Sequence, residues 1–287
     1  MKNFKKFAAI ALSAVLSMSM FAGCSSSAAS AEAANRLEAI KARGYLEVAT
    51  EPYFAPNEFI DAAKPEGEQI VGSDIELAKA IADKIGVELR IIPLEFGAVI
   101  SSVTEGKYDM AISALAYTPA RAEAMELSDG YYFNPNNKGY SLMVREEDAD
   151  LYKSFDDFNG KSVVCQSGSL QELYATTQMN YKEFGDFPRV SSTTDGYLMV
   201  SEGKADAAVC AVSNAELYCA ANPGLVVLDD VLKFETDPAT DGTRIGIPKG
   251  ETELLALVNE VIAELLASGQ YMEWYDSYAE YAATLGI

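Results

Sequence analysis

The sequence predicts an α/β protein with two lobes, in which each lobe has a mostly parallel sheet flanked by helices. Short apolar segments of strand length alternate with amphipathic helical segments and short loops, the pattern of parallel sheets with right-handed crossovers. The alternation restarts near residue 139, so two similar units stand in tandem. The chain has 287 residues and is 49% hydrophobic, which suffices for packed cores in one or two domains.

The first unit is expected to contain helix 35–43, strand 46–50, an irregular aromatic loop at 51–59, helix 73–85, strand 87–94, a helix ending at Gly106 and strand 110–113. Gly44 and Gly86 end the first two helices. Ser73 is followed three residues later by Glu76, so the second helix is expected to begin with a capping box. Its apolar side chains fall on one face, and the strands are short apolar runs between turns.

The second unit is expected to contain an extended segment at 139–144, strand 162–165, a Ser/Gly turn at 167–169 with a helix after it, helix 194–202, strand 205–210, a helix from 213–214 and strand 225–228. Charged, turn-like residues follow the extended segment up to Asp157, and Gly203 ends helix 194–202. Backbone N–H groups at the helix start after 167–169 form a ready anion site, with hydroxyls beside them.

The C-terminal part returns to an extended segment at 242–248 and ends in two helices. Helix 251–267 carries an apolar stripe and is terminated by Gly269, and helix 271–281 is rich in aromatic residues. The side chains expected on the buried side of helix 251–267 are Leu254, Leu257, Val258, Val261, Ile262, Leu265 and Leu266.

The segment 113–121, which reads SALAYTPAR, follows a buried strand of the first unit. Thr118 is a typical N-cap, and Pro119 suits the first helical position. A strand therefore delivers backbone groups, a hydroxyl and the guanidinium of Arg121 to its carboxyl end, where open α/β sheets bind ligands. The five-donor fork of Arg121 suits a carboxylate or phosphate. The alternative is a capping Thr118 beside a solvated Arg121 in a surface ion pair.

Aromatic residues follow the other two strands of the first unit. Phe54 lies in the loop after strand 46–50, and Phe96 lies just after strand 87–94. Because the carboxyl ends of parallel strands meet at one edge, both rings are expected near segment 113–121, as the walls of a small-molecule pocket. A core position is the alternative for Phe96.

The first 24 residues have the pattern of an export signal. Lys2, Lys5 and Lys6 form a basic start, an apolar run follows from 7 to 21, and Ala and Gly precede Cys24. The run is too short to span a bilayer comfortably. Its end resembles a bacterial lipobox, which implies cleavage before Cys24 and lipid attachment to its thiol. A soluble secreted protein with a plain signal peptide is the alternative.

Charge and composition exclude several classes of function. The formal net charge is −21, or −24 without the three lysines of the signal, and so acidic a surface repels nucleic acid and anionic lipid. This charge favours solubility and can favour cationic ligands. The chain has no histidine, which excludes histidine-based nucleophile systems, general bases and metal sites. We predict no catalytic residue, no metal and no cofactor.

Three cysteines lie beyond the signal. An odd number in an exported protein argues against a disulfide framework, so Cys165, Cys210 and Cys219 are expected to be buried small apolar residues. A bridge between Cys210 and Cys219 stays open.

The order of these motifs resembles the bacterial extracellular solute-binding proteins of family 3, the polar amino-acid receptors of ABC importers. The matching segments run in family order over roughly residues 45 to 280, and their common register makes them specific. They read LEVATEPYFAPNEF, VGSDIELAKAIADKIG, EGKYDMAISALAYTPARAEAMELSDGYY, FNGKSVVCQSGS, EGKADAAV and GIPKGETELLALVNEVIAEL.

The resemblance implies a two-lobe clamshell of the type II periplasmic-binding-protein fold, with hinge strands at 139–144 and 242–247. The implied domains are a signal peptide at 1–23, a lipid-anchored flexible tether at 24–35, a discontinuous first lobe at 36–138 plus 243–287, and a second lobe at 139–242 that includes the hinge segments. The lobes are expected to close around the ligand by a hinge motion.

The resemblance also implies how the ligand's carboxylate and amine are held. In such receptors the arginine that matches Arg121 takes the α-carboxylate, helped by the backbone N–H at Ala116 and by the region of Ser169. The carbonyl at Ala114 receives the α-amino group.

Other positions of the family bind the ligand's side chain. Aromatic residues that match Phe54 and Phe96 sandwich it, and Glu51 and Gln166 match positions that recognise its polar end. The complete ligand-binding set expected from the resemblance is Glu51, Phe54, Phe96, Ser113, Ala114, Ala116, Arg121, Gln166 and Ser169.

One position departs from the family pattern. Family members commonly have an aspartate that pairs the α-ammonium, and the matching residue here is Ala211. Because a buried ammonium without a carboxylate is costly, either Glu51 or Glu216 substitutes, or backbone and hydroxyl groups such as Ser213 suffice, or the ligand is not a simple α-amino acid.

The function implied is that of a receptor anchored to the outer face of the cell membrane by lipidated Cys24. It would capture a small amino acid or an amino-acid-like carboxylate and deliver it to an ABC permease, as a monomer without catalysis. One alternative is an exported dehydratase-like enzyme that acts on a prephenate-like acid, with Glu51 as its acid or base. Another is a sensor domain, which the absence of an apolar span after residue 24 disfavours.

Overall fold

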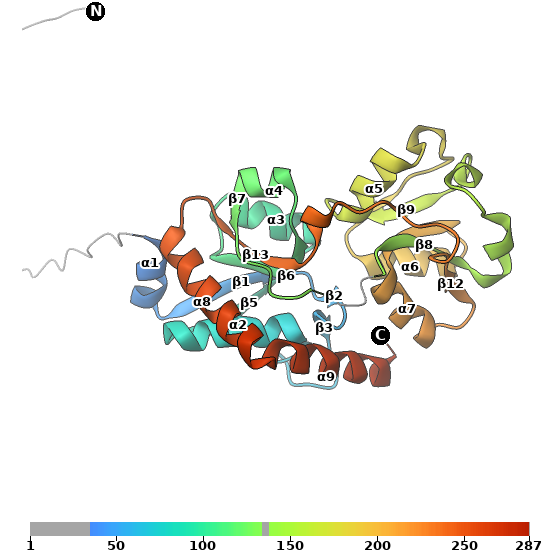
Figure 1. The fold of residues 1–287 in the computed structure, drawn as a ribbon. Coiled ribbons are helices and arrows are strands. Elements are labelled where there is room, and N and C mark those ends of the chain that lie inside the picture. Colours follow the sequence, from blue (N-terminus) through green and yellow to red (C-terminus); the bar gives the residue numbers. More distant parts are fainter. Residues whose placement is uncertain (1–34, 134–137, 287) are drawn as a thin grey trace, which may run out of the picture. The chain divides into compact units, whose positions relative to one another are not determined.

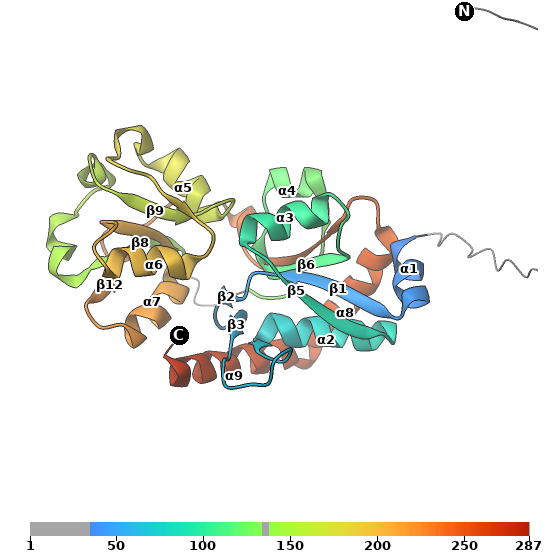
Figure 2. The same cartoon turned by 180° about the vertical axis from the view of Figure 1, so that it is seen from behind.

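The computed structural model describes residues 35–133 and 138–286 (Figures 1 and 2). The predicted signal peptide, the lipidation site Cys24 and all of the tether except Asn35 lie outside the described residues. In the described part of the chain, no helix has the length and apolar character needed to cross a membrane.

The first sheet has five strands in the order β5-β1-β6-β13-β7. They are β5 (Glu88–Pro93), β1 (Tyr45–Thr50), β6 (Met110–Ala116), β13 (Thr243–Pro248) and β7 (Met125–Leu127). β1 pairs in parallel with β5 and β6, whereas β13 is antiparallel to both of its neighbours. Four strands therefore share one direction, and the reversed strand is β13.

Helices cover both faces of the first sheet (Figures 1 and 2). They are α1 (Arg36–Arg43), α2 (Ser73–Ile85), α3 (Phe96–Thr104), α4 (Pro119–Ala124), α8 (Thr252–Ser268) and α9 (Gln270–Leu285). Along β1, Val48 packs with α2 and α8 in one core, and the next residue, Ala49, packs with α3 in another. This alternation follows from the two-residue period of a strand.

The second sheet repeats this arrangement in the order β10-β9-β11-β8-β12. Its strands are β10 (Arg189–Val190), β9 (Val163–Gln166), β11 (Ala207–Ala211), β8 (Tyr140–Arg145) and β12 (Leu225–Val227). Its helices are α5 (Leu170–Gln178) on one face and α6 (Thr193–Ser201) with α7 (Val212–Ala221) on the other (Figures 1 and 2). The reversed strand is β8, so both expected hinge segments are the antiparallel strand of a sheet.

Short elements complete the chain. Among the described residues, 3₁₀ segments lie at Glu146–Leu151, Phe155–Phe158, Tyr181–Glu183 and Pro238–Thr240. The expected irregular loop at 51–59 is partly wrong, because β2 (Tyr53–Phe54) and β3 (Glu58–Ile60) pair there, and β3 also pairs with β4 (Ile70–Val71). The ring of Phe59 packs against Tyr278 and Tyr281 of α9, a contact that local sequence does not reveal.

The expected capping box at the start of α2 is wrong. Gly72 is the N-cap at φ +136°, no side chain caps the helix, and Ser73 is already helical. The Ser73 hydroxyl instead hydrogen-bonds the Tyr271 hydroxyl of α9 at 3.0 Å. Gly72 is required there, since an added Cβ would lie 2.1 Å from the Asn57 carbonyl oxygen.

The buried stripe of α8 is narrower than expected. Leu254, Val258, Val261 and Ile262 are buried, Leu257 and Leu265 are half-buried against the same core, and Leu266 is 43% exposed. The prediction is therefore wrong for Leu266. Cysteines in the second unit are free: Cys165 and Cys210 are buried and Cys219 is half-buried, so the bridge between Cys210 and Cys219 is absent.

Candidate ligand-binding site

The structure brings the nine predicted ligand-binding residues to one cavity of about 40 Å³. They come from the carboxyl ends of β1, β5 and β6, from the β2 hairpin, and from the turn between β9 and α5. The cavity is lined by Glu51, Phe54, Phe96, Ser113, Ala114, Ala116, Arg121, Gln166 and Ser169, together with Glu58, Tyr140, Leu170 and Gln171. Such a volume holds a few water molecules at most, well below an amino acid.

Arg121 is held in this cavity by the local structure that the sequence predicts. The Thr118 hydroxyl accepts from the Arg121 backbone N–H at 3.1 Å, and Pro119 is the first residue of α4. The side chain is only 8% exposed and donates from Nη1 to the Ala116 carbonyl at 2.8 Å and from Nη2 to the Gly168 carbonyl at 3.1 Å. The alternative of a solvated arginine in a surface ion pair is therefore wrong.

The Arg121 guanidinium remains a cation despite its burial. Burial lowers its pKa to about 10, which still leaves it charged at neutral pH. Its Cζ lies 5.5 Å from the centre of the Phe96 ring. Among the described residues, no carboxylate forms an ion pair with it, so its charge is available to an anionic ligand group.

Two carboxyl groups that are almost fully buried face the same cavity. The Ser113 hydroxyl joins the Glu58 side chain to the Glu51 backbone, because its Oγ accepts from the Glu51 backbone N–H and donates to Glu58 Oε1, both at 3.1 Å. Glu51 Oε1 and Glu58 Oε2 are buried and have no protein partner. Such acceptors are costly to leave unpaired, which is typical of a site that receives a polar group.

Burial changes the protonation of both acids. Burial raises the pKa of Glu51 to about 8, with the Gln166 amide opposing the shift and the Asp195 carboxylate adding to it. Burial, together with the nearby Asp74 and Glu51 carboxyls, holds the pKa of Glu58 well above its usual range. Sequence reasoning missed Glu58, because no local pattern shows that its side chain is buried against Ser113 and not exposed to water.

A bulge in β6 shapes the middle of the site. Ala114 has φ +46°, and the pairing with β13 slips between Arg244 and Gly246. The Ala114 backbone N–H donates to Asp74 Oδ2 at 2.9 Å, outside the strand ladder. The buried Asp74 also accepts from the hydroxyls of Tyr131 and Tyr271, at 2.7 and 2.8 Å. Sequence reasoning missed Asp74, which sits in an otherwise ordinary helix start.

The second unit contributes the turn between β9 and α5. Ser169 caps α5 by accepting from the Glu172 backbone N–H at 3.2 Å, and its hydroxyl donates to the Gln166 carbonyl at 2.7 Å. The Gln166 side-chain amide donates to the Ser191 carbonyl at 3.1 Å. One backbone N–H of the expected anion site is already occupied, because the Gly168 N–H donates to the Glu172 carboxylate at 2.9 Å.

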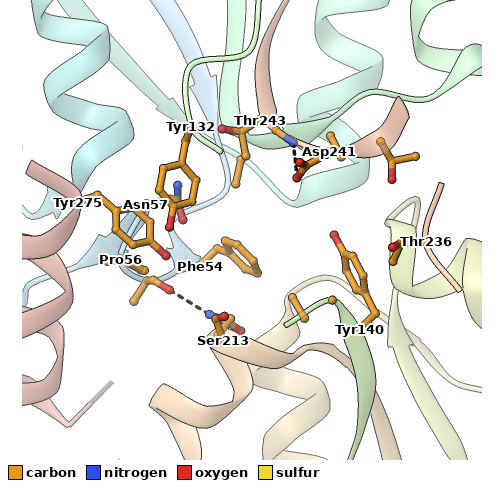
Figure 3. Close-up of a pocket in the computed structure, with 18 of the residues that line it drawn as sticks. Phe54, Pro56, Asn57, Tyr132, Tyr140, Ser213, Thr236, Asp241, Thr243 and Tyr275 are labelled. Carbon is orange, nitrogen blue, oxygen red and sulfur yellow. Dashed lines mark hydrogen bonds between the residues drawn. The ribbon is translucent and has the colours of Figure 1, made fainter. Parts of the chain in front are cut away.

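A second cavity, of about 290 Å³, shares part of its lining with the first one, and Figure 3 shows this second cavity. Both are lined by Phe54, Ala114, Ala116 and Tyr140. The larger cavity is also lined by Ala211, by the aromatic rings of Tyr132 and Tyr275, which stack with centres 4.1 Å apart, and by residues of the segment 236–243.

The residues considered as substitutes for an aspartate at position 211 lie in different places. Ser213 lines the larger cavity and Glu51 lines the smaller one, whereas Glu216 lines neither and pairs with Lys138. Asp241 lines the larger cavity and accepts from the Gly242 N–H at 2.9 Å. No group of three or more potential ligating side chains that could hold a metal ion exists among the described residues.

Hydrogen bonds connect the two units beside the site. Asn214 Nδ2 of α7 donates to the Ala55 carbonyl at 3.0 Å, and Thr194 Oγ1 of α6 donates to the Tyr53 carbonyl at 3.3 Å. Both acceptors flank Phe54, so the second unit contacts the backbone of the loop that presents this ring.

Comparison with known proteins identifies related sequences and structures. Residues 46–281 match the bacterial extracellular solute-binding proteins, family 3. The arginine-binding extracellular protein ArtP of Bacillus subtilis is 29% identical over 211 residues, 71% of this chain and 76% of the relative. A structure of an amino acid ABC transporter substrate-binding protein from Streptococcus pneumoniae bound to L-arginine has TM-score 0.76 and 34% identity, covering 86% of this chain and 98% of that chain.

A further related structure is an ancestral amino-acid-binding protein, described as a precursor of cyclohexadienyl dehydratase. It is 28% identical, has TM-score 0.70 and covers 85% of this chain and 99% of that chain. The fold of these structures is the type II periplasmic-binding-protein fold expected from the sequence, with two sheets flanked by helices.

Proposed function

The chain belongs to the bacterial extracellular solute-binding proteins of family 3, and we propose that it is an importer's receptor for a basic amino acid, with L-arginine as first candidate. Relatives named as arginine-binding and histidine-binding proteins support this choice of ligand. The acidic chain, with a formal charge of −21, would attract cations.

One observation carries the proposal: a buried guanidinium and a buried carboxyl group with an unpaired oxygen face the same cavity. Arg121 suits the α-carboxylate of a ligand, and Glu51 suits a cationic group at the end of its side chain. Phe54 and Phe96 provide apolar surface for the carbon chain between them. This is the charge pattern of a basic amino acid.

Calorimetry with L-arginine and with citrulline, its neutral counterpart, tests the proposal. We expect arginine to bind more tightly than citrulline, and Arg121→Ala to lose about 2–5 kcal/mol of binding, as expected for one partner of a desolvated pair. Arg90→Ala is the matched control, because Arg90 is exposed and lies outside the cavity. Near-wild-type affinity of the Arg121→Ala protein would refute the assignment.

The chain is proposed to bind without catalysis. The dehydratase alternative draws support from one ancestral relative and from Glu51, whose raised pKa of about 8 would suit a general acid. Incubation with prephenate-like acids should give no ultraviolet product signal. Product formation that disappears in Glu51→Gln would establish the enzymatic function instead.

Membrane attachment through Cys24 is proposed from the sequence pattern. The family is extracellular, which agrees with an exported receptor that delivers its ligand to an ABC permease as a monomer. We expect Cys24→Ser to release the protein from washed membranes and to abolish incorporation of labelled palmitate. Cys219→Ser should leave both unchanged, and a Cys24→Ser protein that stays membrane-bound would contradict the anchor.

The proposed lobes are 36–138 plus 243–287 and 139–242, with hinge strands at 139–144 and 242–247. Each set contains all strands of one of the two five-stranded sheets. Closure around the ligand would follow from contacts with both lobes, because a ligand favours the state to which it binds better.

A further inference from the structure

A further cavity, of about 230 Å³, is lined by the segment 52–60, which holds β2 and β3, and by the helices α6 and α7. We call it the hairpin cavity. Neighbouring residues of β2 face different cavities: Tyr53 lines this one, and Phe54 lines the two described above. This follows from the two-residue period of a strand. The hairpin cavity is lined by Pro52, Tyr53, Ala55, Phe59, Ile60, Thr194, Tyr197, Asn214, Leu217 and Tyr218.

Aromatic rings make up much of this lining. They belong to Tyr53, Phe59, Tyr197 and Tyr218, and the last two pack with ring centres 5.1 Å apart and planes at 51°. In the described part of the chain, no lysine or arginine group lies over any of these rings. The negative faces of the rings are therefore not used by a cation of the protein itself.

The polar side chains of the lining are already engaged with the protein. Thr194 Oγ1 donates to the Tyr53 carbonyl at 3.3 Å, and Asn214 Nδ2 donates to the Ala55 carbonyl at 3.0 Å. Asn214 Oδ1 accepts from the Tyr197 hydroxyl at 2.8 Å. A ligand with many hydrogen-bonding groups would lose bonds to water without replacing them. The cavity therefore favours a ligand group that needs no hydrogen bonds.

The charge of the surrounding elements favours a cation. No charged side chain lines the cavity itself. The charged residues of segment 52–60, α6 and α7 are Glu58, Asp195 and Glu216, with no lysine or arginine. Glu216 pairs with Lys138, whereas Asp195 is exposed. Together with the formal charge of −21 of the whole chain, these acids produce a negative potential that attracts cations and repels anions.

The hairpin cavity is large enough for a small ligand and can be reached from solvent. A cavity of roughly 150 Å³ already holds a benzene ring, and this one has about 230 Å³. Two lining side chains are partly open to water, because Tyr53 is 48% exposed and Ile60 is 36% exposed. A ligand can therefore enter beside β2 and β3.

We propose that the hairpin cavity is a second binding site, separate from the site of Arg121, and that it takes a small quaternary ammonium cation of the size of choline. Such a cation carries its charge without any N–H group, so it suits aromatic faces in acidic surroundings where the polar side chains are already bonded. The inference does not depend on the ligand proposed for Arg121, and either proposal can fail while the other stands.

Calorimetry with three probes tests the chemistry of the site. The probes are choline, the neutral alcohol in which a tert-butyl group replaces the trimethylammonium group, and ethanolamine, which has the charge but also three N–H groups. We expect choline to bind at least about tenfold more tightly than either of the others. Equal affinity for the neutral alcohol would show an apolar pocket only, equal affinity for ethanolamine would show recognition by a carboxylate, and no binding of choline would show no site; each result would overturn the inference.

Variants test the location of the site. Tyr218→Leu removes a ring but keeps an apolar side chain, so it should weaken choline by about tenfold while arginine affinity stays within about twofold. Tyr181→Leu is the matched control, because Tyr181 lies outside the cavity. The partly exposed Tyr53→Leu should show the same loss as Tyr218→Leu, and it decides the question if thermal melting shows that Tyr218→Leu is unfolded.

Two results would contradict this location. Choline affinity that is retained when the rings are removed would show that the hairpin cavity is not the site. A loss of choline binding in Arg121→Ala would place choline beside Arg121 instead, and the inference would be overturned.

Discussion

At the scale of single residues, the site combines a buried cation with a buried acid whose pKa is raised, so that it is mostly protonated at neutral pH. Arg121 is charged at neutral pH, whereas the pKa of Glu51 is raised to about 8 chiefly by burial. Glu51 therefore carries its proton through most of the neutral range until a cationic group replaces the missing solvation. Both residues face one cavity, and each would bind one of the two ends of a ligand.

Binding of a basic ligand should release a proton from Glu51. A guanidinium next to the carboxylate lowers its pKa, so affinity for arginine should rise with pH and level off above about 8, the pKa of the free protein. Calorimetry in two buffers of different ionisation enthalpy measures the release. Glu51→Gln should abolish the pH dependence, and an unchanged dependence in that variant would assign the proton to another group.

The same carboxyl group should make the ligand-free protein less stable as pH rises. Its pKa is about 4.5 unfolded and about 8 folded, so between these values the folded state binds more protons. The contribution to stability is fully present below about 4.5 and is lost as pH rises through about 8. Thermal melting across this range should show the loss, smaller in Glu51→Gln and unchanged in the exposed control Glu88→Gln.

At the scale of elements, the β6 bulge depends on a helix and a side chain far from it in sequence. Asp74, near the start of α2, accepts from the Ala114 N–H of β6 and from the Tyr271 hydroxyl of α9. Three elements thus meet at one buried carboxylate. The left-handed conformation of Ala114 is maintained by these hydrogen bonds, because an alanine does not favour φ +46° by itself.

Removing the charge of Asp74 should loosen this part of the site. Asp74→Asn replaces an acceptor oxygen by a donor that faces other donors, and we expect a loss of about 3 kcal/mol of folding stability, typical of a broken buried polar network. Urea denaturation measures the loss. Asp83→Asn in the same helix is the exposed control, and equal stability of both variants would show that the bulge does not need Asp74.

At the scale of the whole molecule, ligand entry should require the two units to move. The cavity beside Arg121 has only about 40 Å³, and the Arg121 guanidinium donates to the Gly168 carbonyl of the other unit. The smaller cavity alone does not hold an amino acid, so we expect binding beside Arg121 to involve a rearrangement, and contacts with both units would then favour the bound arrangement.

Small-angle X-ray scattering checks this movement. We expect saturating arginine to change the radius of gyration of the wild-type protein, because the two units must move to admit the ligand. The Arg121→Ala variant should show no change at the same arginine concentration. An unchanged radius of gyration in a wild-type protein that binds arginine would contradict a hinge movement.

The sequence by itself determined two tandem α/β units and the expectation that Phe54, Phe96 and segment 113–121 meet at one sheet edge, because these depend on local signals such as the Thr118 cap and on the rule that parallel strands end at one edge. The type II fold and the remaining residues of the smaller cavity came from the resemblance to the family, which the structure's neighbours and the cavity lining agree with. Only the tertiary structure decided the pairing of β2, β3 and β4, the hydrogen bonds of Ser73, the burial of Glu58 and the larger cavity. Their partners are distant in the chain, and no local pattern records whether a polar side chain faces water or another element.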